Sequence, residues 1–213
     1  MNPGRASRDA GPAPVFCTRA LDLARILPAL DEIGAVAVPV LDDGYRRSLV
    51  EAAKACRFRP ARPLVGRGEH RVRQRMEVSD DFPAESAFRG LTDAFQRLWD
   101  EGLAGTHERP FEGRLVFNDL MLQRYTVGEV GITPHRDRTG YRNLVCLFIL
   151  EGVGRFYVCE NRAGRGAREI PHVAGDVLLM RAPGFRGSSE RPFHFVRDIR
   201  SPRYIFGLRQ ERL

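Results

Sequence analysis

The chain is short of lysine, of paired cysteines and of long apolar stretches. Lys54 is the only lysine among the 34 lysine and arginine residues, so the net charge of +7 and the isoelectric point of 9.8 come from arginine. An arginine-rich chain suits a polyanionic partner such as nucleic acid. The same charge also suits an ordinary solvated surface, and its spread along the whole sequence favours this second interpretation.

The four cysteines, Cys17, Cys56, Cys146 and Cys159, form no Cys-x-x-Cys pair and lack the spacing of a zinc site. This pattern favours a reducing compartment, in which free thiols persist. The N-terminus lacks the apolar core of a signal peptide, and the longest apolar run, residues 144–150, is far shorter than a membrane span. We therefore expect a cytoplasmic protein that has no membrane partner.

A length of 213 residues suits one domain, and contents of 43% hydrophobic and 29% charged residues are typical of globular proteins. We expect residues 1–14 to be disordered and residues 15–213 to form a single domain. Within it, residues 15–113 would form a helical and strand support and residues 114–213 the core. The expected elements of the support are helices over 19–34, 43–56 and 84–102 and a strand over 35–41.

From residue 114 onward, short apolar or alternating runs are separated by turn residues such as Gly152 and Gly184. The candidate strands are 115–125, 143–151, 155–159, 168–172, 176–181, 193–197 and 203–210. So many short strands predict a mostly β domain with flanking helices (α+β). The architecture expected is a double-stranded β-helix of the jelly-roll or cupin type, which can hold small ligands.

A histidine and an aspartate stand two residues apart in the sequence Ile-Thr-Pro-His-Arg-Asp, which ends at Asp137. An extended backbone would point the side chains of His135 and Asp137 to the same face. His194 lies in a later apolar strand and offers a third ligand. Two histidines and one carboxylate form the facial triad of non-haem Fe(II) sites. The competing interpretations are an ordinary turn carboxylate and a core histidine, while His70, His107 and His172 have no partner at ligand spacing.

The last predicted strand alternates two kinds of side chain. Tyr204, Phe206 and Leu208 would occupy one face, and Arg203 and Arg209 would share the other. If that second face looks into a barrel, two guanidinium groups lie in a confined space and require an anion. A small dicarboxylate would supply the negative charge.

These motifs resemble the Fe(II)/2-oxoglutarate-dependent dioxygenases, through His135-x-Asp137, His194 and Arg203. Within that superfamily, Arg203-Tyr204-x-x-x-x-Arg209-Gln210 and Leu122-Gln123-Arg124-Tyr125 resemble the AlkB-like branch. The resemblance covers about residues 115–210. The chain departs from it at Ile205, where the family usually has asparagine or serine, and at Gln123, where the branch has asparagine.

The resemblance implies Fe(II), 2-oxoglutarate and O2 as cofactor and co-substrates. The implied metal ligands, which are also the catalytic residues, are His135, Asp137 and His194. The implied co-substrate residues are Arg203, Arg209, Tyr125 and Gln123. The expected reaction hydroxylates or oxidatively demethylates a substrate and releases succinate and CO2.

The substrate stays open between a small molecule, a residue of another protein and alkylated nucleic acid. Nucleic acid is not favoured, because no aromatic cluster stands out as a base-stacking platform. Arg71, Arg73 and Arg75 alternate with other residues and would form a cationic strand face that grips phosphates or only faces water. The alternatives to an oxygenase are a cupin-like metal-binding protein and a basic nucleic-acid-binding module without catalysis.

Overall fold

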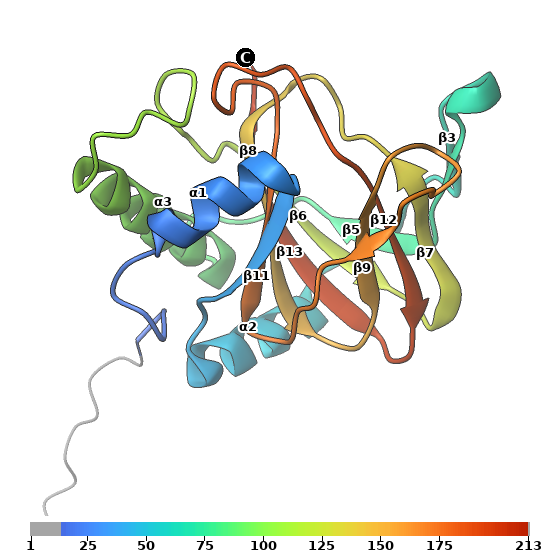
Figure 1. Ribbon diagram of the computed structural model, residues 1–213. Helices are drawn as coiled ribbons and strands as arrows, with labels where there is room; N and C mark the ends of the chain where they lie inside the picture. Colours follow the sequence, from blue (N-terminus) through green and yellow to red (C-terminus); the bar gives the residue numbers. More distant parts are fainter. Residues whose placement is uncertain (1–13, 213) are drawn as a thin grey trace, which may run out of the picture.

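The computed structural model describes residues 14–212, so the expectation of disorder over residues 1–14 falls, except for Pro14, outside the described part. Two antiparallel sheets face each other, and helices cover the outer face of the larger sheet (Figure 1). The larger sheet has seven strands in the order β1-β11-β8-β13-β6-β5-β2, and the smaller has four in the order β10-β9-β12-β7. This double-stranded β-helix confirms the predicted fold class.

The bounds of the elements are as follows. The helices are α1 (Leu23–Glu32), α2 (Asp43–Ala55), α3 (Ala87–Ala104) and the short 3-10 helix η1 (Gly68–His70). The strands before α3 are β1 (Ala35–Pro39), β2 (Arg59–Pro60), β3 (Leu64–Val65), β4 (Val72–Arg73) and β5 (Met76–Ser79). Those after it are β6 (Asp119–Tyr125), β7 (Gly128–His135), β8 (Tyr141–Glu151), β9 (Arg155–Cys159), β10 (Arg168–Glu169), β11 (Asp176–Arg181), β12 (Phe193–Ile199) and β13 (Arg203–Glu211).

The three helices begin where a polar side chain caps them. Asp22, Asp42 and Ser86 each accept a hydrogen bond from the backbone N–H three residues later. The first and third helices therefore start later than the predicted 19 and 84, because the caps fix their first turns. At the other end of α1, Gly34 adopts a φ of +87°, which turns the chain directly into β1.

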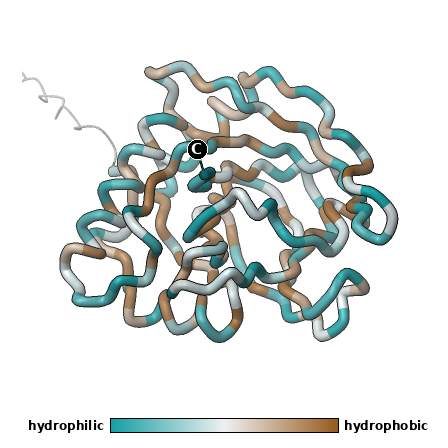
Figure 2. Tube along the Cα trace, turned by 90° about the horizontal axis from the view of Figure 1, so that it is seen from above, coloured by the Kyte–Doolittle hydropathy of each residue, from teal (hydrophilic) through white to brown (hydrophobic). Residues whose placement is uncertain are grey.

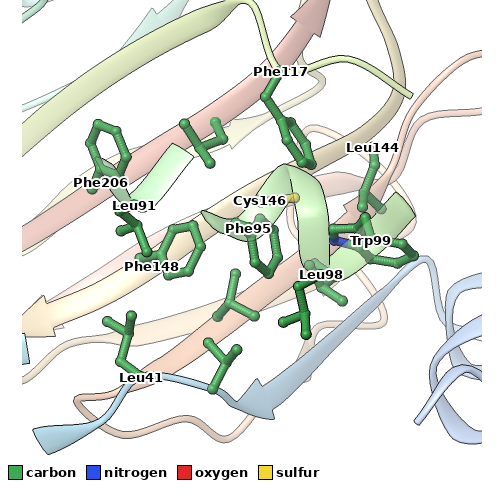
Figure 3. Packing of buried hydrophobic residues seen from close by; sticks show 14 of the residues in the cluster. Leu41, Leu91, Phe95, Leu98, Trp99, Phe117, Leu144, Cys146, Phe148 and Phe206 are labelled. Carbon is green, nitrogen blue, oxygen red and sulfur yellow. The ribbon is translucent and has the colours of Figure 1, made fainter. Parts of the chain in front are cut away.

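The helices and the larger sheet share one apolar core. Phe95 of α3 meets Phe148 of β8 at 4.8 Å between ring centroids (Figure 3). Phe88, also of α3, meets Phe206 of β13 at 4.9 Å. Trp99 is fully buried in the same cluster. Aromatic contacts of this kind fix α3 against the sheet, so the helices provide a rigid support for β8 and β13.

A second core fills the space between the two sheets and includes Ile132, Val145, Phe156 and Ile205. Hydrophobic and hydrophilic residues are interspersed along the described trace, with no long apolar segment (Figure 2). No helix among residues 14–212 is long and apolar enough to cross a membrane. Several predicted site residues line a cavity together with side chains of this second core.

Two elements differ from the prediction. The run of Arg71, Arg73 and Arg75 is not one strand, since β4 ends at Arg73 and the N–H of Arg75 donates to the carbonyl oxygen of Gly131 in β7. Strand β7 was absent from the candidate strands, although it carries the first histidine. In addition, β1, β2 and β5 belong to the seven-stranded sheet, so residues 15–113 contribute strands as well as support.

Candidate metal and co-substrate site

Neighbouring strands bring the three predicted metal ligands together. His135 ends β7, and His194 is its direct partner on the antiparallel strand β12, so that the two imidazole centroids lie 4.3 Å apart. Asp137 follows in the loop, with Oδ1 3.9 Å from Nε2 of His135 and 3.8 Å from Nε2 of His194. All three ligand atoms lie within 4.8 Å of one another. Donors bound to one ion at about 2.1 Å are at most about 4.2 Å apart, so small side-chain adjustments suffice.

Backbone carbonyl groups fix the orientation of both imidazoles. Nδ1 of His135 lies 2.9 Å from the oxygen of Thr133, and Nδ1 of His194 lies 3.2 Å from the oxygen of Pro192. Because a carbonyl only accepts, each Nδ1 is the donor, which leaves Nε2 as the nitrogen that a neutral imidazole offers to a metal. The free lone pairs are on the side of Asp137, as metal coordination requires.

The electrostatic environment favours the deprotonated ligand set. Burial, followed by the nearby His194, lowers the pKa of His135 well below its usual range. Burial alone would raise the pKa of Asp137, but His194, His135 and Arg209 together lower it. At neutral pH the site therefore presents a neutral His135 imidazole and a carboxylate, which is the protonation state that a divalent cation needs.

The arginine pair lies inside the fold as the alternation predicted. Tyr204, Phe206 and Leu208 belong to the core under the helices, whereas Ile205 lies between the sheets. Arg203 and Arg209, which share that second face, are only 1% and 6% exposed.

Arg203 is a buried cation that forms no ion pair with any carboxylate of residues 14–212. Its Nε has no hydrogen-bond partner, and burial lowers its pKa to about 10, which still leaves it charged at neutral pH. Arg209 donates to Asp119 at 3.3 Å, but its Nε is also without a partner. A buried guanidinium without a counter-charge is costly, so this arrangement fits a bound anion.

His172 contacts the candidate site, although the sequence indicated no partner for it. It lies in the loop between β10 and β11, where its Nδ1 is 2.8 Å from the oxygen of Ile170 and its Nε2 is 2.6 Å from Nη2 of Arg203. With the proton on Nδ1, Nε2 accepts a hydrogen bond from the guanidinium. No local motif could have revealed this contact, because it joins two residues 31 positions apart.

A small cavity of about 40 Å³ adjoins the three ligand residues, and Gln123, Tyr125 and Arg209 also line it. Burial raises the pKa of Tyr125 to about 12, so its hydroxyl stays a hydrogen-bond donor. One water requires roughly 10–15 Å³, so the cavity has room for an ion and a few waters. Arg203 is the strand partner of Tyr125 but does not line the cavity. A dicarboxylate that reached from the metal to Arg203 would therefore move lining side chains apart.

No family model matches the sequence, and no curated protein matches it. Solved structures do match. A prolyl-4-hydroxylase from Pseudomonas putida aligns with a TM-score of 0.58 and 17% identity, over 90% of this chain and 100% of that one. A prolyl hydroxylase from Trichoplax adhaerens, in complex with a hypoxia inducible factor peptide fragment, aligns with a TM-score of 0.60 and 12% identity over 87% of both chains.

HygX from Streptomyces hygroscopicus, with nickel and 2-oxoglutarate bound, aligns with a TM-score of 0.57 and 15% identity, over 88% of this chain and 86% of that one. At such low identity these likenesses establish the fold alone. The chain has the double-stranded β-helix fold of the 2-oxoglutarate-Fe(II) oxygenases. Two of the three structures are prolyl hydroxylases, so they give no support to the AlkB-like branch.

Proposed function

We propose that this protein is an Fe(II)- and 2-oxoglutarate-dependent dioxygenase that oxidises a C–H bond of its substrate. One observation carries the proposal. Within this fold, His135, Asp137 and His194 converge on one point, while the buried Arg203 guanidinium has no counter-charge among residues 14–212. A cupin-like protein that only bound a metal would have no use for a buried, uncompensated cation, so Arg203 favours the oxygenase.

His135, Asp137 and His194 would hold the iron on one face and leave the opposite positions open for ligands. When bound, iron and 2-oxoglutarate supply the oxidation: the co-substrate is decarboxylated to succinate and CO2 as O2 is consumed and a substrate C–H bond is oxidised. The carbonyl groups of Thr133 and Pro192 keep each imidazole turned toward the metal. The sheets around the cavity exclude bulk water from the reacting groups.

Arg203 would bind the distal carboxylate of 2-oxoglutarate, because a guanidinium fork can make two parallel hydrogen bonds to a carboxylate. Arg209, whose charge lowers the pKa of Asp137, would bind the end of the co-substrate near the metal. Tyr125 would donate its hydroxyl proton in a hydrogen bond, and Gln123 its amide. Ile205 is buried among apolar side chains and offers no such bond.

The test is anaerobic addition of Fe(II) and 2-oxoglutarate to the purified protein, followed by absorption spectroscopy. A metal-to-ligand charge-transfer band should appear in the wild type and in His70→Ala, which removes an exposed histidine. It should be absent from Asp137→Ala. Admission of O2 should then produce succinate. Absence of the band from the wild type, or its persistence in a His135→Ala/Asp137→Ala double variant, would contradict the proposal.

The proposal extends to the substrate class and to the cellular compartment. The Arg203–Gln210 and Leu122–Tyr125 motifs support an AlkB-like oxidative demethylation, whereas the likeness to an enzyme crystallised with a peptide fragment supports a peptide substrate. Methylated oligonucleotides and proline-containing peptides, compared for stimulation of succinate release, separate these two. Cys17, Cys56, Cys146 and Cys159 are all free thiols, which supports a reducing compartment such as the cytoplasm.

A further inference from the structure

A polar cleft opens beside the candidate metal site. It has a volume of about 570 Å³, and its lining includes Arg136, Arg191 and Phe193. Arg136 stands between the ligands His135 and Asp137 in the sequence, and Phe193 directly precedes His194. A cleft of this size suits a small molecule or one segment of a larger substrate.

Three arginines gather around Phe193 and the metal loop. The guanidinium carbon of Arg136 lies 4.2 Å from the ring centroid of Phe193, and that of Arg162 lies 5.7 Å from it. Arg191 donates a hydrogen bond to the backbone oxygen of Asp137. Within residues 14–212, none of the three forms an ion pair with a carboxylate, and Nη1 of Arg162 is buried without a partner.

Among the other arginines that line the cleft, Arg181 pairs with Glu190 at 2.7 Å, whereas Arg168 forms no ion pair within residues 14–212. Arg138, which follows Asp137 in the sequence, pairs with Glu211 at 2.9 Å. Glu32 and Glu160 also line the cleft. Neither carboxylate forms an ion pair with an arginine of the described chain. The lining therefore holds three unpaired arginines, Arg136, Arg168 and Arg191, against these two unpaired carboxylates.

Arg136 and Arg191 place two like charges at one cleft, and no carboxylate of residues 14–212 forms an ion pair with either. A bound anion would offset their repulsion. Stacking on Phe193 restricts the rotamers of Arg136, so its guanidinium is partly preorganised for binding.

We propose that Arg136 and Arg191 bind an anionic group of the substrate, a carboxylate or a phosphate, and thereby hold its oxidisable C–H bond beside the metal. This inference rests on the proposed oxygenase function, and it names the substrate class as anionic. A guanidinium fork matches a carboxylate or phosphate in shape and charge. Neither Arg136 nor Arg191 is needed as a metal ligand.

The test uses the full chain loaded with Mn(II) in place of iron and saturated with 2-oxoglutarate, so that the site at Arg203 is filled. Inorganic phosphate is titrated, and its 31P relaxation reports phosphate held near the metal. We expect saturable enhancement in the wild type, a dissociation constant raised at least about 10-fold in Arg136→Gln and in Arg191→Gln, and little change in Arg138→Gln. Loss of one charge-assisted hydrogen bond corresponds to about this factor.

Two results would overturn the inference: no saturable phosphate binding, or equal weakening in Arg138→Gln, which would indicate only general surface charge. Calorimetric titration of phosphate into the metal-free protein separates this inference from the oxygenase proposal, because the arginines do not require the metal. Loss of phosphate binding in Arg191→Gln without metal supports the cleft even if no charge-transfer band forms. Displacement of phosphate by acetate indicates a carboxylate substrate, and failure of acetate to displace it indicates a phosphate.

Discussion

Nη2 of Arg203 lies 2.6 Å from Nε2 of His172, and this neutral acceptor holds a buried cation in place without neutralising it. A carboxylate beside Arg203 would both orient the guanidinium and neutralise its charge, whereas His172 only orients it. His172 orients the guanidinium, while the positive charge stays available for an anionic ligand. A carboxylate at position 172 would satisfy Arg203 permanently and would compete with the co-substrate.

His172→Ala should therefore weaken 2-oxoglutarate binding while the metal site stays intact. Loss of a hydrogen bond to a charged group corresponds to about 1.5–3 kcal/mol, or a factor of roughly 10–100 in the dissociation constant. Titration of 2-oxoglutarate, followed by its charge-transfer band under anaerobic conditions, measures the change. His172→Gln, whose amide oxygen can accept the same bond, should restore most of the affinity. Equal affinity in wild type and His172→Ala would show that His172 does not position Arg203.

Arg203→Met should separate stability from ligand binding. A buried, unpaired guanidinium is costly, so its replacement by an apolar side chain of similar length should leave the ligand-free protein at least as stable as the wild type. The same variant should lose the increase in melting temperature that 2-oxoglutarate gives the metal-loaded wild type. Thermal unfolding with and without 2-oxoglutarate measures both. A variant that is much less stable yet still responds to 2-oxoglutarate would contradict this role.

The pH dependence of folding stability should include a contribution from His172. Burial, and then the charge of Arg203, lower the pKa of its imidazole below the usual value of 6.5. The unfolded chain then binds the proton more readily than the folded one, so stability is fully present above about pH 6.5 and falls as pH decreases toward the lowered pKa. The slope of this contribution is at most about 1.4 kcal/mol per pH unit. Chemical denaturation from pH 8 to pH 5 should show a shallower loss in His172→Gln, and parallel curves would contradict the assignment.

Phe95→Ala should destabilise the fold without acting on the site directly. Phe95, on the face of α3 that meets the larger sheet, is fully buried and packs against Phe148. Removal of a buried aromatic ring typically costs about 3–5 kcal/mol. Urea denaturation should show this loss, whereas Val173→Ala, at an exposed position, should change stability by less than about 0.5 kcal/mol. At low temperature, folded Phe95→Ala should keep the wild-type affinity for 2-oxoglutarate.

The sequence predicted which residues of the candidate site lie together, because these residues stand in local patterns. His135 and Asp137 are two residues apart, and Arg203 and Arg209 stand in a strand that alternates apolar and polar side chains. Such periodicity determines which side chains share a face. The burial of both arginines and the contact of His135 with Asp137 follow from these patterns.

Features that depend on distant contacts could not be predicted in this way. His172 meets Arg203 only because the loop before β11 folds against the start of β13. Strand β7 was missed because Gly128, Gly131 and Pro134 weaken its strand signal, and it is stabilised by pairing with β12. The join of β1 to β11 and of β5 to β6 likewise depends on pairing between distant segments.

Anomalous scattering at the iron edge, from crystals grown anaerobically with Fe(II) and 2-oxoglutarate, tests the proposed iron site most directly. We expect one strong peak within bonding distance of Nε2 of His135, Nε2 of His194 and a carboxylate oxygen of Asp137. We also expect the distal carboxylate of 2-oxoglutarate to contact the guanidinium of Arg203. An iron peak elsewhere in the fold, or a 2-oxoglutarate bound away from Arg203, would contradict it.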